Sequence, residues 1–137
     1  MTPRRLVTRF YEEVWNRADP AAIPELFHPD CVFRGSLGAE RHGHEGLAAY
    51  VREVTGALSG YRCEIEALVV EDERAFARMR FSGRHTGEFL GFAPTGRELS
   101  WAGAALFECG GGRIRSLWVL GDLAGLRAQL EGQARGA

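Results

Sequence analysis

The spacing of hydrophobic residues in this chain changes period once, near Tyr61, and that change constrains the fold more than any other feature. Up to Leu58, apolar residues recur at every third and fourth position, which is typical of one buried helix face. Beyond Tyr61, apolar and polar residues alternate, as they do in half-buried strands. Helices that precede a long antiparallel meander indicate an α+β fold. At 137 residues, we expect one domain over residues 1–137.

Three helices are predicted before the change of period. The first covers residues 4–17, and a second, short helix begins at Asp19 and Pro20, which suit an N-cap and a first helical turn. The third covers about 44–58 and ends at Ser59-Gly60. A short strand at 31–33 and a polar loop at 34–43 lie between the second and third helices.

Four strands and a final helix are predicted after the change. They cover residues 61–69, 75–85, 97–109 and 113–121 for the strands and about 123–131 for the helix. On the second of these strands, Ala77, Met79, Phe81 and His85 share one face. A strongly curved sheet wrapped around the helices forms a cone with a cavity between helix and sheet, which is a usual place for a small-molecule site.

Composition excludes several classes of function. The formal net charge is -1, so the clustered basic charge of a nucleic-acid binder is missing. No apolar run reaches the ~20 residues that a membrane span needs, and no apolar stretch follows the basic N-terminus, so we expect no signal peptide. Three scattered cysteines, Cys31, Cys63 and Cys109, indicate buried thiols in a reducing cytoplasm.

Asp122 is the main candidate for chemistry. Strict alternation places Ile114, Ser116, Trp118 and Asp122 on one face of the last strand. If that face points into the cone, the Asp122 carboxylate is desolvated, and its proton affinity rises toward that of a general acid or base. The alternative is structural, because Asp122 directly precedes the final helix and Asp is a favoured N-cap.

His85 and three tryptophans are further candidates. His85 continues an inward face, where it would orient a substrate carbonyl or exchange protons; alternatively, it is a buried histidine that holds the 87–96 loop closed. Trp15, Trp101 and Trp118 come from three separate elements and suit the walls of a site for a flat ligand, or an ordinary core. Arg97 either pairs with an acidic ligand group or is a solvated residue at the start of a strand.

A metal site is not predicted. His42 and His44 lie near Glu40 and Glu45, but their spacing matches no tetrahedral ligand pattern. The glycine-rich segments lack the lysine of a phosphate-binding loop. We therefore expect no metal and no phosphate cradle.

The stretch from Ser82 to Arg97, which contains His85-Thr86-Gly87 and Pro94-Thr95-Gly96-Arg97, resembles the SnoaL-like polyketide cyclase family. Phe27 to Asp30 and the Trp118-to-Asp122 spacing extend that resemblance over nearly the whole chain. The family belongs to the group that includes nuclear transport factor 2 and ketosteroid isomerase. The resemblance implies a cone-shaped α+β barrel, a homodimer or higher homo-oligomer packed through its sheet, and cofactor-free aldol cyclisation with the residue at Asp122 as general acid/base.

Two hypotheses follow. In the first, the protein is a cofactor-free cyclase or isomerase that acts on a small hydrophobic, polyketide-like carbonyl compound, with Asp122 and His85 as catalytic residues. Trp15, Trp101, Trp118 and Arg97 would bind the substrate. In the second, the cone binds a small hydrophobic molecule without chemistry. The almost wholly apolar strand 101–106 offers few donors to an enolate, so an apolar pocket with one acid fits a substrate other than that of an aldol cyclase, or a binding role.

Overall fold

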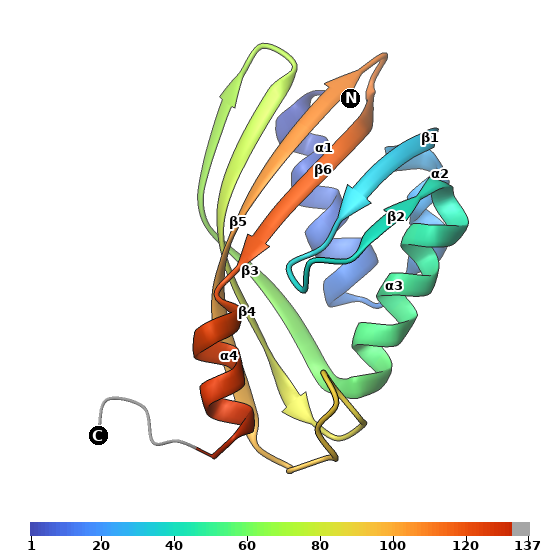
Figure 1. Cartoon of the computed structure of the whole chain (residues 1–137). Coiled ribbons are helices and arrows are strands. Elements are labelled where there is room, and N and C mark those ends of the chain that lie inside the picture. The colour runs from blue at the N-terminus through green and yellow to red at the C-terminus, as the bar shows by residue number, and fades with distance from the viewer. Residues whose placement is uncertain (133–137) are drawn as a thin grey trace.

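The computed structural model describes residues 1–132 and packs helices against one curved sheet (Figure 1). The helical elements are α1 (Pro3–Arg9), the π-helix η1 (Phe10–Asn16), the 3-10 turn η2 (Pro20–Ala22), α2 (Ile23–Leu26), α3 (Gly43–Ala57) and α4 (Leu123–Leu130). The strands are β1 (Phe27–Arg34), β2 (Glu40–His42), β3 (Leu58–Glu71), β4 (Arg74–His85), β5 (Glu98–Gly110) and β6 (Arg113–Gly121). In residues 1–132, no helix has both the length and the apolar character of a bilayer span.

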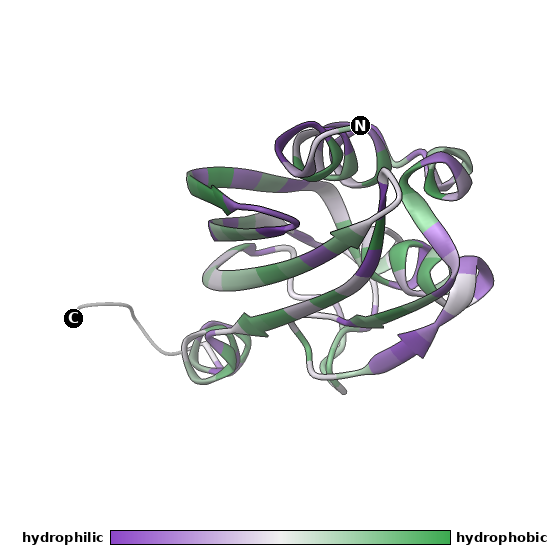
Figure 2. Ribbon diagram, turned by 90° about the horizontal axis from the view of Figure 1, so that it is seen from above, coloured by the Kyte–Doolittle hydropathy of each residue, from purple (hydrophilic) through white to green (hydrophobic). Residues whose placement is uncertain are grey.

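The six strands form one curled sheet that does not close. Their order is β2-β1-β6-β5-β4-β3, so β2 and β3 are its two edges. β1 pairs with β6 in parallel, and the other neighbours pair antiparallel. Seen from above, the sheet bends and the N-terminal helices close its open side (Figure 2). The predicted α+β class and curved-sheet architecture are confirmed.

The predicted elements are present, with shifted ends. The helix expected at 4–17 is α1 continued by η1, and α3 lies within one residue of its predicted span. β1 is longer than the short strand expected at 31–33, because residues 27–30 pair irregularly with β6. β2 lies inside the segment expected to be a polar loop. It pairs only with β1, and no apolar alternation marks its three residues.

β4 has the faces that its alternation predicts. Ala77, Met79, Phe81 and His85 point into the core, whereas Arg78 and Arg84 are exposed. The inward hydrophobic residues belong to the same buried cluster as side chains of the helices, among them Leu6, Val7, Phe10, Leu47, Val51 and Val54. Because this strand is paired without interruption to β5, its alternation holds over its full length.

β6 departs from strict alternation, which makes the predicted face of its second half wrong. Cys109 pairs with Ile114 and Glu108 with Ser116, which leaves Arg115 without a partner of its own on β5, as in a β-bulge. One extra residue exchanges the two faces of everything that follows. Ile114 therefore points inward as expected, but Trp118 points outward and is 46% exposed.

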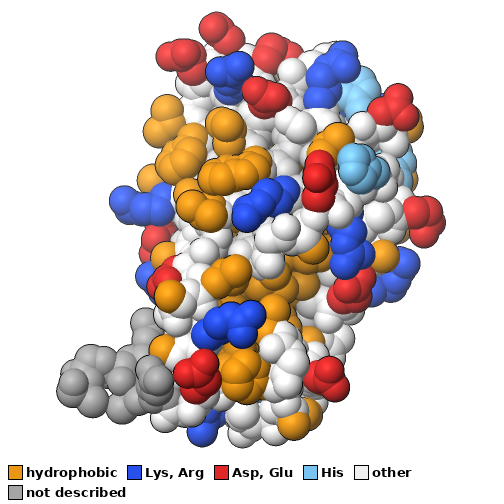
Figure 3. All heavy atoms as spheres, viewed as in Figure 1, with side chains coloured by type: hydrophobic (Ala, Val, Ile, Leu, Met, Phe, Trp, Pro, Cys, Tyr) orange, Lys and Arg blue, Asp and Glu red, His pale blue; other side chains and the backbone are white. Residues whose placement is uncertain are grey.

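The outward side chains of β3 to β6 form a row that we call the outer apolar row. It consists of Val69, Phe76, Leu106 and Trp118, and each is the cross-strand partner of the next. All four are exposed, and Leu120 extends the apolar surface one pair further along β6. Figure 3 shows hydrophobic side chains gathered over this part of the sheet. The Arg34 guanidinium lies 5.4 Å from the centre of the Trp118 ring.

Candidate functional site

Asp122 lies at the end of β6, but it is exposed and caps α4. Its Oδ1 atom accepts a hydrogen bond of 3.0 Å from the Gly125 backbone N–H. The expected position among inward aromatic side chains is wrong, because the bulge at Arg115 reverses the face on which Trp118 and Asp122 were placed. The helix-cap interpretation is confirmed, and the catalytic role of Asp122 stays a prediction.

The three tryptophans lie in three different environments. Trp15 is buried in η1 and points into the cone, and Trp101 is buried on β5 with 2% of its surface exposed. Trp118, predicted to line the same cavity, lies on the outer face instead. Arg97 is exposed, and its guanidinium donates to the backbone carbonyl of Gln129 at 2.9 Å. The structure thus places Trp15 and Trp101 in the interior and leaves Trp118, Asp122 and Arg97 outside it.

His85 is fully buried and attached to the loop that follows it. Its Nδ1 atom lies 3.0 Å from the Thr95 hydroxyl and accepts from the Thr95 backbone N–H at 3.3 Å. With Nδ1 as acceptor, the neutral ring carries its proton on Nε2. That Nε2 atom is buried without a hydrogen-bond partner in residues 1–132. The contacts with Thr95 fit a structural role at the loop, and a catalytic role for His85 stays a prediction.

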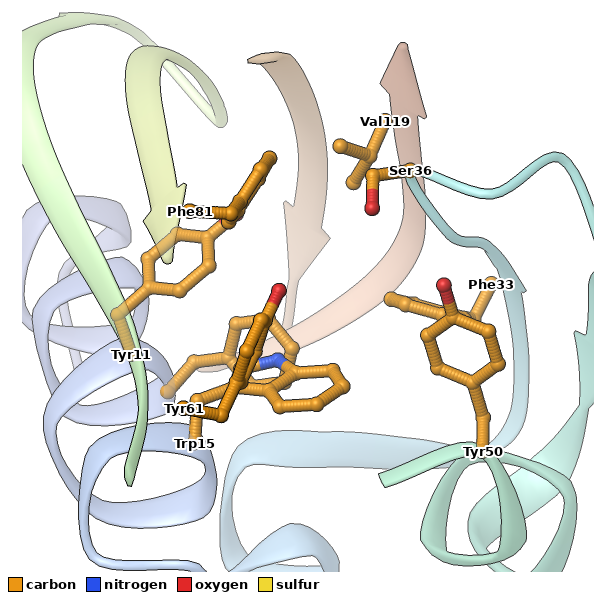
Figure 4. A pocket seen from close by; sticks show the side chains of 9 residues that line it. Tyr11, Trp15, Phe33, Ser36, Tyr50, Tyr61, Phe81 and Val119 are labelled. Carbon is orange, nitrogen blue, oxygen red and sulfur yellow. The ribbon is translucent and has the colours of Figure 1, made fainter. Parts of the chain in front are cut away.

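The interior of the cone contains a small chamber lined mainly by aromatic rings (Figure 4). Its walls are Phe10, Tyr11, Trp15, Phe33, Ser36, Tyr50, Tyr61, Phe81 and Val119. Within the described part of the chain, no charged side chain lines this chamber. Its free volume is about 10 Å³, which is room for about one water molecule.

The π-helical turn explains how one helix supplies three of these rings. A π-helix has more residues per turn than an α-helix, so residues four and five apart lie closer to one face. Phe10, Tyr11 and Trp15 accordingly all reach the chamber from η1. Ring centres of Trp15 and Tyr61 lie 5.2 Å apart, and those of Trp15 and Tyr50 lie 5.9 Å apart in an edge-on arrangement. Such T-shaped contacts are the favoured geometry for aromatic pairs.

The polar groups of the chamber are neutral. The Tyr11 hydroxyl is buried without a hydrogen-bond partner in residues 1–132, and burial raises the pKa of Tyr11 well above its usual value. Burial also raises the pKa of Tyr50 to about 12, although its hydrogen bonds to the Leu37 backbone and the Ser36 side chain act in the opposite direction. In Figure 4 the hydroxyls of Ser36 and Tyr50 point into the same space. The tyrosines therefore stay protonated and act as hydrogen-bond donors or acceptors rather than as charges.

Trp101 supplies a second buried donor beside the chamber. Its ring lies 5.6 Å from that of Phe81 and 6.1 Å from that of Tyr61, measured between centres. Its Nε1 atom has no hydrogen-bond partner in the described chain. A Cβ atom added to Gly121 would lie 3.3 Å from this nitrogen and 2.7 Å from the Ser36 carbonyl oxygen. The indole N–H thus lies near Ser36 at the edge of the chamber.

A surface groove lies next to the chamber. It runs between the C-terminal half of α3, the loop after β1 and the loop after β4, and has a free volume of about 210 Å³. Its lining is Leu37, Tyr50, Glu53, Val54, Ala57, Glu88, Phe89 and Leu90. Glu53 and Glu88 are the two charged residues of that lining, and both are exposed. Tyr50 belongs to the linings of both groove and chamber.

Sequence reasoning missed the tyrosines and Ser36 as site residues. Tyr11, Tyr50 and Tyr61 were assigned to apolar helix and strand faces, which is correct, but an apolar face does not tell a cavity wall from a packed core. The usable signal was composition, because all three tyrosines of the chain fall on inward faces. In residues 1–132, no group of three or more histidine, cysteine or acidic residues is placed to hold a metal ion.

Comparisons with known proteins agree with this architecture. A model of the SnoaL-like polyketide cyclase family matches residues 5–130. TsrD from Streptomyces laurentii is 31% identical, with 93% of this chain and 92% of that chain covered and a TM-score of 0.83. A SnoaL-like polyketide cyclase from Agrobacterium tumefaciens shares the fold at 19% identity. The match covers 95% of this chain and 98% of that chain, with a TM-score of 0.80.

One further neighbour has a bound molecule. A protein of ketosteroid isomerase-like fold from Catenulispora acidiphila was solved in complex with trimethylamine. It is 19% identical to this chain, 98% of this chain and 96% of that chain are covered, and the TM-score is 0.80, so the likeness concerns the fold alone. No curated protein sequence matches the chain.

Proposed function

The chain belongs to the SnoaL-like polyketide cyclase family, and on that premise we propose that its chamber binds a small, flat, largely apolar compound that carries a carbonyl oxygen. One observation carries this proposal: an uncharged aromatic chamber is lined by Tyr11, whose buried hydroxyl has no hydrogen-bond partner in residues 1–132. Aromatic walls favour a flat apolar body.

The unpaired hydrogen-bond donors at the chamber favour a ligand with a carbonyl oxygen. A buried donor without a partner costs about 1–3 kcal/mol, which a bound acceptor returns. Tyr11 and Trp101 both offer hydrogen atoms at or beside the chamber, and an indole N–H only donates. A carbonyl oxygen accepts from such groups, whereas a hydrocarbon of the same shape leaves them unpaired. Specificity for the oxygen therefore comes from these two residues.

A pair of shape-matched probes tests the proposal. We expect 2-acetylnaphthalene to bind more tightly than 2-isopropenylnaphthalene, which has a CH₂ group in place of the oxygen. Tyr11→Phe removes the donor but keeps the ring, and should weaken binding of the ketone by about fivefold to twentyfold. Trp118→Phe, on the outer face, is the matched control and should leave both affinities unchanged. Equal affinity of the two probes for the unaltered protein contradicts the proposal.

A second proposal keeps the cyclase or isomerase reaction of the first hypothesis. Its support is the position of Asp122, directly after Gly121, whose backbone packs against Ser36 of the chamber wall. In this proposal, the Asp122 carboxylate removes a proton from the carbon next to the carbonyl and returns it elsewhere, and His85 orients the substrate. The reaction needs neither a metal nor a covalent intermediate.

Deuterium uptake tests that step. In D₂O, 2-tetralone exchanges the hydrogens next to its carbonyl when a base removes them, and NMR follows the exchange. Asp122→Asn keeps a good helix cap, because asparagine also accepts from backbone N–H groups, but removes the carboxylate. We expect the variant to fold normally and lose catalysed exchange. Full exchange in the variant eliminates Asp122 as the base.

We also propose that the outer apolar row joins two copies of the chain. Its support is the continuous exposed surface formed by Phe76, Leu106 and Trp118, since apolar patches of this kind mark interaction surfaces. Trp118→Glu should shift the protein from dimer to monomer in sedimentation velocity. Ala124→Glu, at an exposed position of α4, is the control and should leave the dimer intact. A monomer before any substitution contradicts this proposal.

A further inference from the structure

We propose that Tyr50 is a gate between the groove and the chamber, and that the ion pair of Arg41 with Glu53 controls how often it opens. The inference rests on the proposed binding of a ligand in the chamber and adds how that ligand enters. It makes Tyr50 a residue that controls access, in addition to being a wall of the site.

The need for a gate follows from the volumes. The chamber has about 10 Å³ of free space and the groove beside it about 210 Å³. Pockets that hold drug-sized ligands measure roughly 300–1,000 Å³, so a bicyclic compound enters the chamber only if a wall residue moves aside. Tyr50 is the one residue shared by the two linings in the described chain. Rotation of its side chain therefore joins the two spaces.

The closed position of Tyr50 depends on the loop after β1. Its hydroxyl points into the same part of the chamber as the Ser36 hydroxyl (Figure 4). The ring end also lies directly over Gly35, where any Cβ atom would collide with the Tyr50 hydroxyl. Because Gly35 has no side chain, the end of the Tyr50 ring fits against it in the closed position. A side chain at position 35 would displace Tyr50 from this position.

The second support comes from β2. The Arg41 guanidinium lies 5.6 Å from the centre of the Tyr50 ring, within the range of a cation–π contact. Arg41 in turn makes two hydrogen bonds, of 2.9 and 3.0 Å, to the Glu53 carboxylate. Glu53 lies one helical turn after Tyr50 on α3, so the ion pair crosses over the ring.

The ion pair of Arg41 with Glu53, which we call the clamp, is weak enough to open. The side chains of Arg41 and Glu53 are 28% and 58% exposed, and exposed ion pairs hold weakly because water competes for both partners. Glu53 also lines the groove, so a molecule seated there lies beside the clamp. Loss of the ion pair frees the guanidinium from Tyr50 without removing any atom of the chamber.

Hydrogen exchange at the Trp15 indole N–H tests the gate without a ligand, since Trp15 lines the chamber and exchange requires water to enter. We expect Arg41→Gln and Glu53→Gln to accelerate this exchange by about threefold to tenfold, and Gly35→Ala to accelerate it as well. Arg84→Gln is the matched control, because its ion pair with Glu98, at 3.2 Å, lies away from the groove. Backbone amides of β4 report global unfolding and should not change.

The association rate of 2-acetylnaphthalene gives a second readout. It should rise in Arg41→Gln in parallel with indole exchange and stay unchanged in Arg84→Gln. Unchanged indole exchange in both Arg41→Gln and Gly35→Ala overturns the gate, and so does acceleration that the β4 amides share. If the ketone does not bind while indole exchange still accelerates selectively, the gate stands and the proposed ligand is wrong.

Discussion

The side-chain amide of Asn16 pairs with both backbone groups of Cys63, as a neighbouring strand would. Its Oδ1 atom accepts from the Cys63 N–H at 2.7 Å, and its Nδ2 atom donates to the Cys63 carbonyl at 3.0 Å. Cys63 lies on β3, which is an edge of the sheet, and no further strand within residues 1–132 pairs with these groups. The last residue of η1 is thereby fixed to the sheet, directly after Trp15 of the chamber wall.

Replacement of Asn16 should therefore destabilise the fold. Asn16→Ala leaves the Cys63 N–H and carbonyl without their partner, and we expect a loss of about 1–3 kcal/mol in the free energy of unfolding. Urea denaturation measures this loss. Ser116→Ala is the control, since it removes a hydrogen bond of 3.2 Å to Glu108 in an exposed setting. Its effect should stay below about 0.5 kcal/mol, and equal losses in the two variants would contradict the prediction.

Asp122 should contribute to stability through its cap on α4. Asp122→Ala removes the acceptor for the Gly125 N–H, and we expect a loss of about 1 kcal/mol. Asp122→Asn should lower the free energy of unfolding by only about a few tenths of a kcal/mol, because asparagine caps a helix nearly as well. Thermal unfolding of the two variants separates the capping role from the catalytic role. A large loss of stability in Asp122→Asn would show that the negative charge itself is required.

The tyrosines should titrate only when the protein unfolds. Burial raises the pKa of Tyr50 to about 12 and holds those of Tyr11 and Tyr61 well above the usual value of 10.0. The folded-state values exceed the unfolded ones, so the stabilisation is complete below pH 10 and is lost as the pH rises through 12. For Tyr50 the loss amounts to roughly 2–3 kcal/mol.

Absorbance of tyrosinate measures this titration. All three tyrosines of the chain are buried, so no phenol should ionise near pH 10 in the folded protein. Ionisation and loss of circular dichroism should instead coincide at higher pH. A phenol that titrates near pH 10 while the fold persists would show that water reaches the chamber freely.

The thiols should react slowly in the folded protein. Burial, with a smaller effect from the Glu73 carboxylate, raises the pKa of Cys109 to about 11, and burial raises that of Cys63 further. The thiolate is the reacting form, so at pH 8 alkylation of Cys109 should be roughly a hundredfold slower than in the unfolded chain. Peptide mapping after iodoacetamide treatment, with and without urea, measures the ratio. Equal alkylation rates with and without urea would mean that the Cys109 thiol is exposed to solvent in the folded protein.

The sequence predicted the fold well because its periods are long and regular. β4 pairs without interruption, so its alternation correctly placed Phe81 and His85 inside. The same rule failed on β6 because the bulge at Arg115 depends on pairing with β5, which local spacing does not encode. Strict alternation therefore placed Trp118 on the wrong face.

The site was predictable only in part. Trp15 and Trp101 are buried, as both the wall and the core interpretation of these residues expected. The chamber itself depends on small gaps between packed rings, and periodicity carries no information about such gaps. The capping role of Asp122 was visible in the sequence, since the residue directly precedes a helix.

The bulge at Arg115 limits which residue roles on β6 can be transferred from a homologous protein to this chain. A homologue that aligns with β6 residue for residue, but lacks the bulge, would present the counterparts of Trp118 and Asp122 to its interior and the counterpart of Val119 to solvent. The buried and the exposed face of this strand would be exchanged with almost no change in the amino-acid sequence. Roles along this strand are therefore transferable only between proteins that share its register.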